Sequence, residues 1–288
     1  MRKNRAPSST AEPVPRVRAF ASADGLLAYR DEGPRSGHPV VLLHPGFADH
    51  TEFDNLVPRL VGHGWRVIAP DARGHGRSAN ASRPFRQTDD LAALLGHLGL
   101  DAPAVLVGIS MGALIAIDTA LEHPSLVSAL VVSGRGLGEP DAGDAWSAAR
   151  RDEQTRALAA GDIPGWLDGL TRWAAGPSRT PADLGPELVG HLREMATRTL
   201  AKHTPDEPDH SVPVADVAAR AQDIAVPVLA VNGTLDTPAC LDTVTALMEA
   251  VPHGRTVDLE GAGHHTSLER PEEFAAILVT FLREVYGD

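Results

Sequence analysis

The residues of this chain best suited to chemistry surround Ser110, in the sequence Gly108-Ile109-Ser110-Met111-Gly112. A strand-like run, 104–107, leads into this segment, and a helix-like run, 113–117, leads out of it. A serine between two glycines at an abrupt strand-to-helix turn is typical of a nucleophile elbow. Such a turn strains the serine backbone, and the neighbouring glycines permit it because they lack a Cβ. We therefore expect an exposed Ser110 hydroxyl at a helix N-terminus, where backbone N–H groups favour negative charge.

A serine hydroxyl is a weak nucleophile at neutral pH, so it needs a base, and the base needs an acid that orients it. Asp236 comes shortly after the strand-like run 226–231, and His264 comes shortly after the strand-like run 256–259. Asp242, on the following helix, is the weaker candidate for the acid. His265 competes with His264 for the role of base, but the glycine spacing favours His264.

The elements that must position these side chains alternate along the chain, which predicts an α/β fold with a mostly parallel central sheet flanked by helices. A hairpin is predicted over 17–30, around Ala23-Asp24-Gly25. The remaining strands are predicted at 40–43, 65–70, 104–107, 129–132, 226–231 and 256–259, and helices at 90–98, 113–123, 241–250 and 271–286.

The alternation stops after the sixth strand. Between 137 and 222 the sequence has helix-like segments at 144–160, 164–175 and 186–203, and no convincing strand. Such an insertion predicts an all-helical lid over the carboxyl ends of the strands, where parallel sheets bind ligands. We expect Trp146, Trp166 and Trp173 to pack inside this lid, although one or two of them could instead line an apolar substrate pocket. The predicted organisation is a disordered tail (1–16), an α/β core (17–136 and 223–288) and a helical lid (137–222).

Composition narrows the functional classes. The 288 residues include 26 Lys and Arg against 38 Asp and Glu, a net charge of −12, which argues against nucleic acid or an anionic membrane as a partner. No apolar run is long enough for a membrane span. The single cysteine, Cys240, cannot form an intrachain disulfide and is expected to be a structural thiol, which favours a cytoplasmic location. No zinc or phosphate-loop spacing is present, so no metal or cofactor is expected.

Three further segments carry a family resemblance. His44-Pro45-Gly46-Phe47 resembles the oxyanion segment of the α/β-hydrolase superfamily, and the run from Asp71 to Ser78 resembles its Asp-x-Arg-Gly-x-Gly-x-Ser signature. The segment from Gly263 to Phe274 resembles its catalytic-histidine segment. With the chain order Ser, Asp, His, residues 17–287 are identified as similar to lidded esterases and haloperoxidase-like serine hydrolases. Pro45 departs from the glycine usual at that position.

The resemblance implies a role for each site residue. Ser110 would attack a carbonyl, His264 would take and return its proton, and Asp236 would fix the imidazole tautomer. The backbone N–H of Met111 would be one oxyanion donor. The second donor would come from the loop after the His44 strand, from Gly46 or, as a second choice, Phe47.

The polar residues near these motifs are expected to support the loops. His44 and His75 should hold loops through hydrogen bonds, while Asp71 and Arg73 should brace a turn. We expect Asp49 and His50 to lie in a solvated loop, although they could also contact a substrate.

Together, these expectations predict a cofactor-free serine hydrolase that cleaves a small apolar carboxylic ester or lactone. The same triad would also serve a haloperoxidase or perhydrolase, or a C–C bond hydrolase. A receptor that keeps the pocket only to bind a small ligand is a third interpretation. Epoxide hydrolases and haloalkane dehalogenases are disfavoured because they carry an aspartate where Ser110 stands. Neither the natural substrate nor the oligomeric state follows from the sequence.

Overall fold

The central element of the molecule is an eight-stranded sheet with the strand order β1-β2-β4-β3-β5-β6-β7-β8. The computed structural model describes residues 17–100, 102–138, 144–204 and 206–287, so the tail predicted at 1–16 lies outside the described residues. β1 and β2 are antiparallel to their neighbours, and the other strands pair in parallel. The predicted α/β fold with a mostly parallel sheet is therefore confirmed. The strands are β1 (Arg18–Ser22), β2 (Gly25–Glu32), β3 (Pro39–Leu43), β4 (Arg66–Pro70), β5 (Ala104–Ile109), β6 (Val127–Ser133), β7 (Val228–Gly233) and β8 (Gly254–Leu259).

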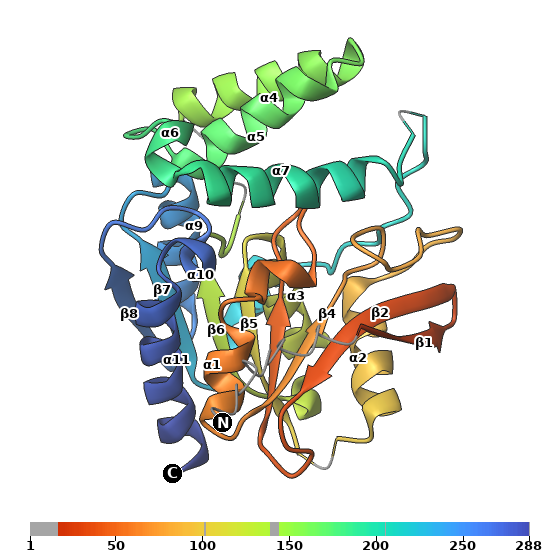
Figure 1. The fold of residues 1–288 in the computed structure, drawn as a ribbon. Coiled ribbons are helices and arrows are strands. Elements are labelled where there is room, and N and C mark those ends of the chain that lie inside the picture. The colour runs from red at the N-terminus through yellow and green to blue at the C-terminus, as the bar shows by residue number, and fades with distance from the viewer. Residues whose placement is uncertain (1–16, 101, 139–143, 205, 288) are drawn as a thin grey trace, which may run out of the picture.

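Helices cover both faces of the sheet (Figure 1). Because successive strand residues point to opposite faces, Val40 and Leu42 of β3 pack in the cluster that contains Phe274 of α11, while Val41 and Leu43 pack toward α2 and α3. A strand buried on both sides needs apolar residues at every position, which explains the continuous run in β3. The covering helices are α1 (Val57–Gly62) and α11 (Pro271–Tyr286) on one face, with α2 (Gln87–Leu98), α3 (Met111–Glu122) and α9 (Pro238–Ala250) on the other.

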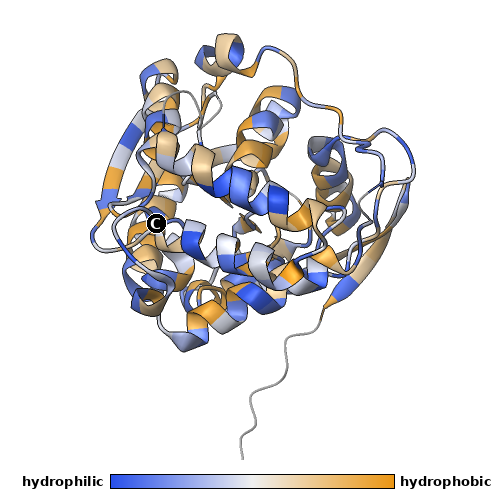
Figure 2. Ribbon diagram, turned by 90° about the horizontal axis from the view of Figure 1, so that it is seen from above, coloured by the Kyte–Doolittle hydropathy of each residue, from blue (hydrophilic) through white to orange (hydrophobic). Residues whose placement is uncertain are grey.

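The helices α4 to α7, which lie between β6 and β7 in the sequence, stand above the carboxyl ends of the strands (Figure 1). Their ends follow from local chemistry, since the Asp144 side chain caps α4 and the Asp162 side chain caps α5. These helices carry both hydrophilic and hydrophobic residues (Figure 2), and Trp166 and Leu167 of α5 pack with Ala196 of α7. The bounds are α4 (Ala145–Ala159), α5 (Ile163–Ala175), α6 (Pro181–Leu184) and α7 (Pro186–Leu200), and α8 (Val217–Arg220) follows them and packs against α3. We call the segment from α4 to α7 the helical insertion; its role as a lid remains a prediction.

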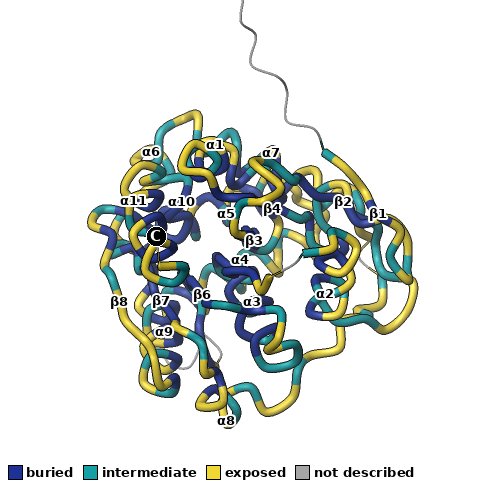
Figure 3. Tube along the Cα trace, turned by 90° about the horizontal axis from the view of Figure 1, so that it is seen from below, coloured by how far each residue is buried: buried dark blue, intermediate teal, exposed yellow. Residues whose placement is uncertain are grey.

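Four short helices complete the described chain: η1 (His50–Phe53), η2 (Pro124–Leu126), η3 (Ala221–Asp223) and α10 (Thr266–Glu269). Buried segments lie mainly toward the middle of the molecule and exposed ones mainly toward its periphery (Figure 3). In the part of the chain that the structure describes, no helix combines the length and the apolar character needed to cross a membrane.

Candidate active site

Ser110 lies at the sharp turn between β5 and α3, with φ 53° and ψ −114°. A residue with a Cβ rarely adopts a positive φ, so the backbone of Ser110 is strained. The turn is tight enough to require both flanking glycines. A Cβ on Gly108 would lie 2.2 Å from the Gly112 oxygen, and one on Gly112 would lie 2.0 Å from the Leu43 oxygen. The Ser110 N–H donates to the Ser133 carbonyl of β6 at 2.8 Å, which anchors the turn to the neighbouring strand.

Asp236 and His264 meet at the ends of the last two strands. Asp236 follows β7 and His264 follows β8, and His264 Nδ1 lies 2.9 Å from one Asp236 carboxylate oxygen and 3.1 Å from the other. The Thr237 N–H donates to the same carboxylate at 2.7 Å. Gly134 leaves room for the pair, because a Cβ there would lie 2.9 Å from His264 Cε1. Asp242, the weaker candidate for the acid, is an exposed residue of α9.

The charge of Asp236 governs the titration of His264. Burial acts to lower the pKa of His264, whereas the Asp236 carboxylate raises it through its charge and its hydrogen bond. The Cys240 thiol, which is itself buried, raises it further. The net result is a pKa well above the ordinary value for histidine.

Ser110 and His264 line one cavity of about 420 Å³. Asp236 does not line this cavity but lies on the Nδ1 side of the His264 ring. The predicted oxyanion residues also reach the cavity, so the structure brings the sequence-predicted site residues together. The lining residues are Pro45, Gly46, Phe47, Ser110, Met111, Leu114, Arg135, Arg151, Gln154, Leu170, Trp173, His264 and His265.

The loop after β3 supplies Gly46 and Phe47. Phe47 has φ 60°, and the Ala48 N–H donates to the Pro45 carbonyl at 3.2 Å, so the loop closes in a tight turn. Neither the Gly46 nor the Phe47 N–H has a hydrogen-bond partner among the described residues. Met111, at the first position of α3, contributes an N–H from a helix N-terminus. These groups can therefore donate to a negatively charged oxygen.

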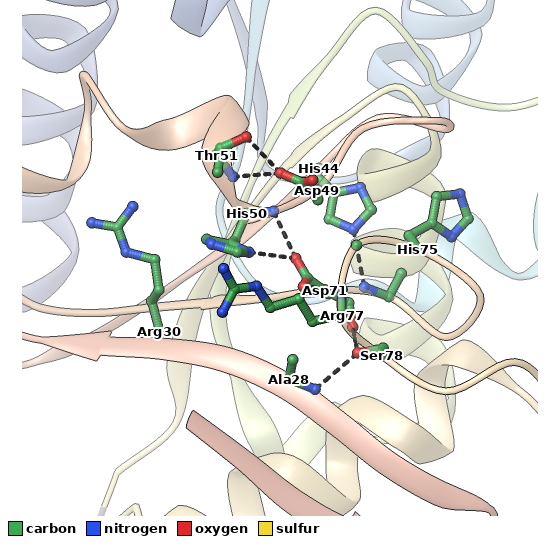
Figure 4. Close-up of polar contacts among 12 residues, drawn as sticks. Ala28, Arg30, His44, Asp49, His50, Thr51, Asp71, His75, Arg77 and Ser78 are labelled. Carbon is green, nitrogen blue, oxygen red and sulfur yellow. Dashed lines mark hydrogen bonds and ion pairs between the residues drawn. The ribbon is translucent and has the colours of Figure 1, made fainter. Parts of the chain in front are cut away.

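The expectation that Asp49 and His50 lie in a solvated loop is wrong, because both residues are buried. Asp49 accepts from the Thr51 N–H at 2.9 Å and pairs with Arg198 of α7 at 2.8 Å. His50 donates its backbone N–H to Asp71 at 2.8 Å, and its Nδ1 lies 2.7 Å from the same oxygen (Figure 4). Neither residue lines the cavity that holds Ser110. Polar side chains in a short loop suggested solvent exposure, but their partners come from distant parts of the chain.

The other motif residues hold loops in place. Besides His50, Asp71 accepts from the Arg77 N–H at 2.8 Å. Burial acts to raise the pKa of Asp71, but these hydrogen bonds and the charges of His50 and His44 together lower it. Arg73 pairs with Asp90 of α2 at 2.7 Å. The Ala72 N–H donates to His44 Nε2 at 3.0 Å, and His75 Nδ1 lies 3.1 Å from the Arg73 carbonyl oxygen.

Among the residues that the structure describes, two groups have ligand atoms close enough for a metal ion, with all separations within 4.8 Å. They are Asp236, Cys240 and His264, and Asp49, His50 and Asp71. In both groups the hydrogen bonds described above already engage the carboxylates and the histidine Nδ1. The donors are therefore committed to one another, and neither group defines a metal centre.

The tryptophans of the insertion differ in role: some pack inside it and one lines the cavity. Trp166 is buried and meets Phe47 edge-to-face, with ring centroids 4.6 Å apart. Trp173 lines the cavity, and its ring centroid lies 5.8 Å from that of Trp146. Sequence periodicity could not separate packing from lining, because a single insertion helix does both.

Some site residues carried no recognisable sequence signal. Arg135 and Arg151 line the cavity from the segment after β6 and from α4. Glu269 of α10 accepts from the Gly263 N–H at 3.0 Å and from the His265 N–H at 3.3 Å, so it clamps the backbone on both sides of His264. The carboxylate of Glu52 in η1 is fully buried against His265.

With the geometry established, comparison with known proteins defines the family. A sequence model of the alpha/beta hydrolase family matches residues 40–277, so the chain belongs to that family. It is similar to a putative non-heme bromoperoxidase BpoC from Mycobacterium tuberculosis, at 32% identity over 90% of this chain and 98% of that protein. It is also similar to a pimeloyl-[acyl-carrier protein] methyl ester esterase from Neisseria meningitidis, at 28% identity over 88% and 96% of the two chains. A solved structure of Est816, an N-acyl homoserine lactone degrading enzyme, shares the fold with a TM-score of 0.73 and 23% identity, covering 92% of this chain and all of that one.

Proposed function

We propose that this member of the alpha/beta hydrolase family is a serine hydrolase that cleaves a carboxylic ester or lactone through an acyl-enzyme on Ser110. The observation that carries the proposal is the shared cavity of Ser110 and His264, with Asp236 bound to the far side of the imidazole. The strained serine supports it further, because strain of this kind is typical of functional positions.

In the proposed reaction, the Ser110 oxygen attacks the ester carbonyl while its proton passes to Nε2 of His264. Asp236 keeps the other proton on Nδ1 and stabilises the imidazolium that forms. The N–H groups of Met111 and Gly46, with Phe47 as the alternative to Gly46, donate to the oxyanion. Loss of one such donor typically costs about 3 kcal/mol of transition-state stabilisation.

Collapse of the tetrahedral intermediate breaks the bond to the alcohol oxygen, which receives the proton from His264. The neutral histidine then takes a proton from water, and the resulting hydroxide attacks the acyl carbon. The acid leaves and Ser110 regains its proton. The helical insertion acts as a lid in this proposal, because it lies over the strand ends where the cavity opens.

The test is turnover of p-nitrophenyl butyrate by the wild type and by Ser110→Ala. We expect the variant to lose essentially all turnover while its far-ultraviolet circular dichroism stays unchanged. Ser125→Ala, at an exposed serine of η2, is the matched control and should keep full turnover. A fluorophosphonate should label the wild type at Ser110 only. Retained turnover by Ser110→Ala would contradict the proposal, and a folded wild type that resists labelling would favour the receptor.

A second candidate, a cofactor-free perhydrolase, is favoured by the 32% identity to the putative bromoperoxidase. In that reaction hydrogen peroxide replaces water as the nucleophile that releases the acyl group, and the peracid formed oxidises bromide. The measurement that separates the two is peroxide-dependent bromination of monochlorodimedone in acetate buffer. Bromination much faster than ester hydrolysis would favour the perhydrolase.

A further inference from the structure

Two imidazoles, not one, line the cavity beside Ser110. The rings of His264 and His265 lie 5.8 Å apart and are nearly perpendicular, at 78°. Nδ1 of His264 is held by Asp236 at 2.9 Å, and Nδ1 of His265 is held by Glu52 at 3.1 Å. His265 therefore has a buried carboxylate partner of its own, supplied by a helix more than two hundred positions earlier in the sequence.

The hydrogen bonds of Glu52 define which nitrogen of His265 carries the proton. The Glu52 carboxylate also accepts from the Ser267 hydroxyl at 3.0 Å. An ionised carboxylate only accepts hydrogen bonds, so the proton between the two groups sits on Nδ1 of His265. In the neutral imidazole Nε2 is then an acceptor. Across the described residues nothing hydrogen-bonds to this Nε2, and the ring lines the cavity.

Burying the Glu52–His265 pair costs desolvation free energy, which suggests that its polar atoms have a function. The Glu52 side chain has no exposed surface and that of His265 has 8%. Two apolar residues would fill the same space without the desolvation cost of a buried carboxylate. The pair instead leaves Nε2 as an acceptor on a ring that lines the cavity.

We propose that His265 is a specificity-determining residue whose Nε2 accepts a hydrogen bond from a hydroxyl or an amide N–H on the substrate. Glu52 is the positioning residue that fixes the required tautomer. This inference rests on the proposed function, because it needs an ester held beside Ser110. A buried acceptor discriminates against substrates without a donor, since binding such a substrate leaves the acceptor unpaired.

The experiment uses two pairs of p-nitrophenyl esters that differ only at the donor. The first pair is 3-hydroxybutanoate and 3-methylbutanoate, in which a methyl replaces the hydroxyl. The second is N-acetylglycinate and 4-oxopentanoate, in which a methylene replaces the amide N–H. For each pair the readout is the ratio of the two kcat/KM values. We expect the wild type to prefer the donor-bearing ester in at least one pair, by roughly tenfold.

His265→Phe should bring that ratio close to one, whatever happens to the two rates themselves, because a change common to both esters cancels. His253→Phe, at an exposed histidine before β8, is the matched control and should keep the wild-type ratio. Glu52→Gln gives a second test that does not depend on His265→Phe folding. Its amide can donate to Nδ1, which moves the ring proton to Nε2 and should also reduce the ratio.

Four results would overturn the inference. A wild type that turns over all four esters without a preference would contradict it and leave the proposed function standing. A wild-type ratio preserved in folded His265→Phe, or in folded Glu52→Gln, would reduce the pair to a structural contact. Failure of the wild type to turn over any of the four esters, and p-nitrophenyl butyrate as well, would overturn the proposed function and this inference together.

Discussion

Arg179 of the helical insertion forms an ion pair of 2.7 Å with Glu269, the residue whose carboxylate clamps the backbone around His264. The two side chains are 14% and 5% exposed, so the bridge is largely removed from water. The insertion is thus tied directly to the loop that carries the candidate base. Breaking a buried pair from one side leaves an uncompensated charge, whereas breaking an exposed pair costs little.

We therefore expect Arg179→Met to lower the free energy of unfolding by about 3 kcal/mol. Arg59→Met is the matched control, because Arg59 pairs at 3.2 Å with Glu272, whose side chain is 80% exposed. That variant should lose less than about 1 kcal/mol. Urea denaturation of both variants measures the difference. Equal losses would mean that the Arg179 bridge does not stabilise the fold more than a surface pair.

The Asp236 charge predicts the pH dependence of hydrolysis. His264 must be neutral to act as a base, and the carboxylate holds the pKa of His264 well above 6.5. The value of kcat/KM for an uncharged ester should therefore rise with pH, and its midpoint should lie above 6.5. Asp236→Asn should move the midpoint to lower pH, because burial then acts without the opposing charge.

The same substitution should lower kcat by about 10³ to 10⁴-fold, since the amide can stabilise the wrong tautomer. A pH-stat assay from pH 5 to 10 measures both effects. A midpoint that does not move in Asp236→Asn would contradict the assigned role of the carboxylate.

The tight turn at Ser110 predicts that alanine substitutions at two helical glycines have opposite effects on stability. A Cβ at position 112 would lie 2.0 Å from the Leu43 oxygen, which is fixed in the sheet. We expect Gly112→Ala to lower the free energy of unfolding by about 3 kcal/mol or more. Gly96→Ala, in α2 where a Cβ meets no atom within 4 Å, should raise it by about 1 kcal/mol. Similar denaturation midpoints for the two variants would show that the close approach at the elbow is not required.

Local patterns predicted most of the fold and indicated the candidate site residues that the structure brings together. The glycines around Ser110 and the placement of Asp236 and His264 just after strands are visible in short windows of sequence, and α11 begins and ends at the predicted residues 271 and 286. Short helices such as α1 were not predicted, because six residues give too little periodicity.

Long-range pairing explains what the sequence could not predict. Glu52 lies 213 positions from His265, and nothing in either segment indicates the other. The burial of Asp49 was missed for the same reason, since Arg198 approaches it from the insertion. A polar residue in a loop has no local feature that distinguishes a solvent-exposed side chain from one with a distant partner.

The environment of Asp118 in α3 predicts that the stability of the fold depends on pH, independently of the active site. Burial, with a smaller contribution from the Glu122 charge, raises the pKa of Asp118 from 3.8 to about 6. The folded state therefore holds this proton more tightly than the unfolded state, and stability falls as pH rises from about 4 to about 6. The penalty is complete above pH 6 and absent below pH 4.

Asp118→Asn removes the charge, so it should stabilise the protein by about 1 to 2 kcal/mol at pH 8, after allowance for the partial exposure of the side chain. At pH 4 the gain should disappear, because the native carboxyl is then protonated. Denaturant melts of the wild type and the variant at both pH values measure the effect. A gain of equal size at pH 4 and pH 8 would point to helix propensity or packing, because neither depends on the ionisation of Asp118.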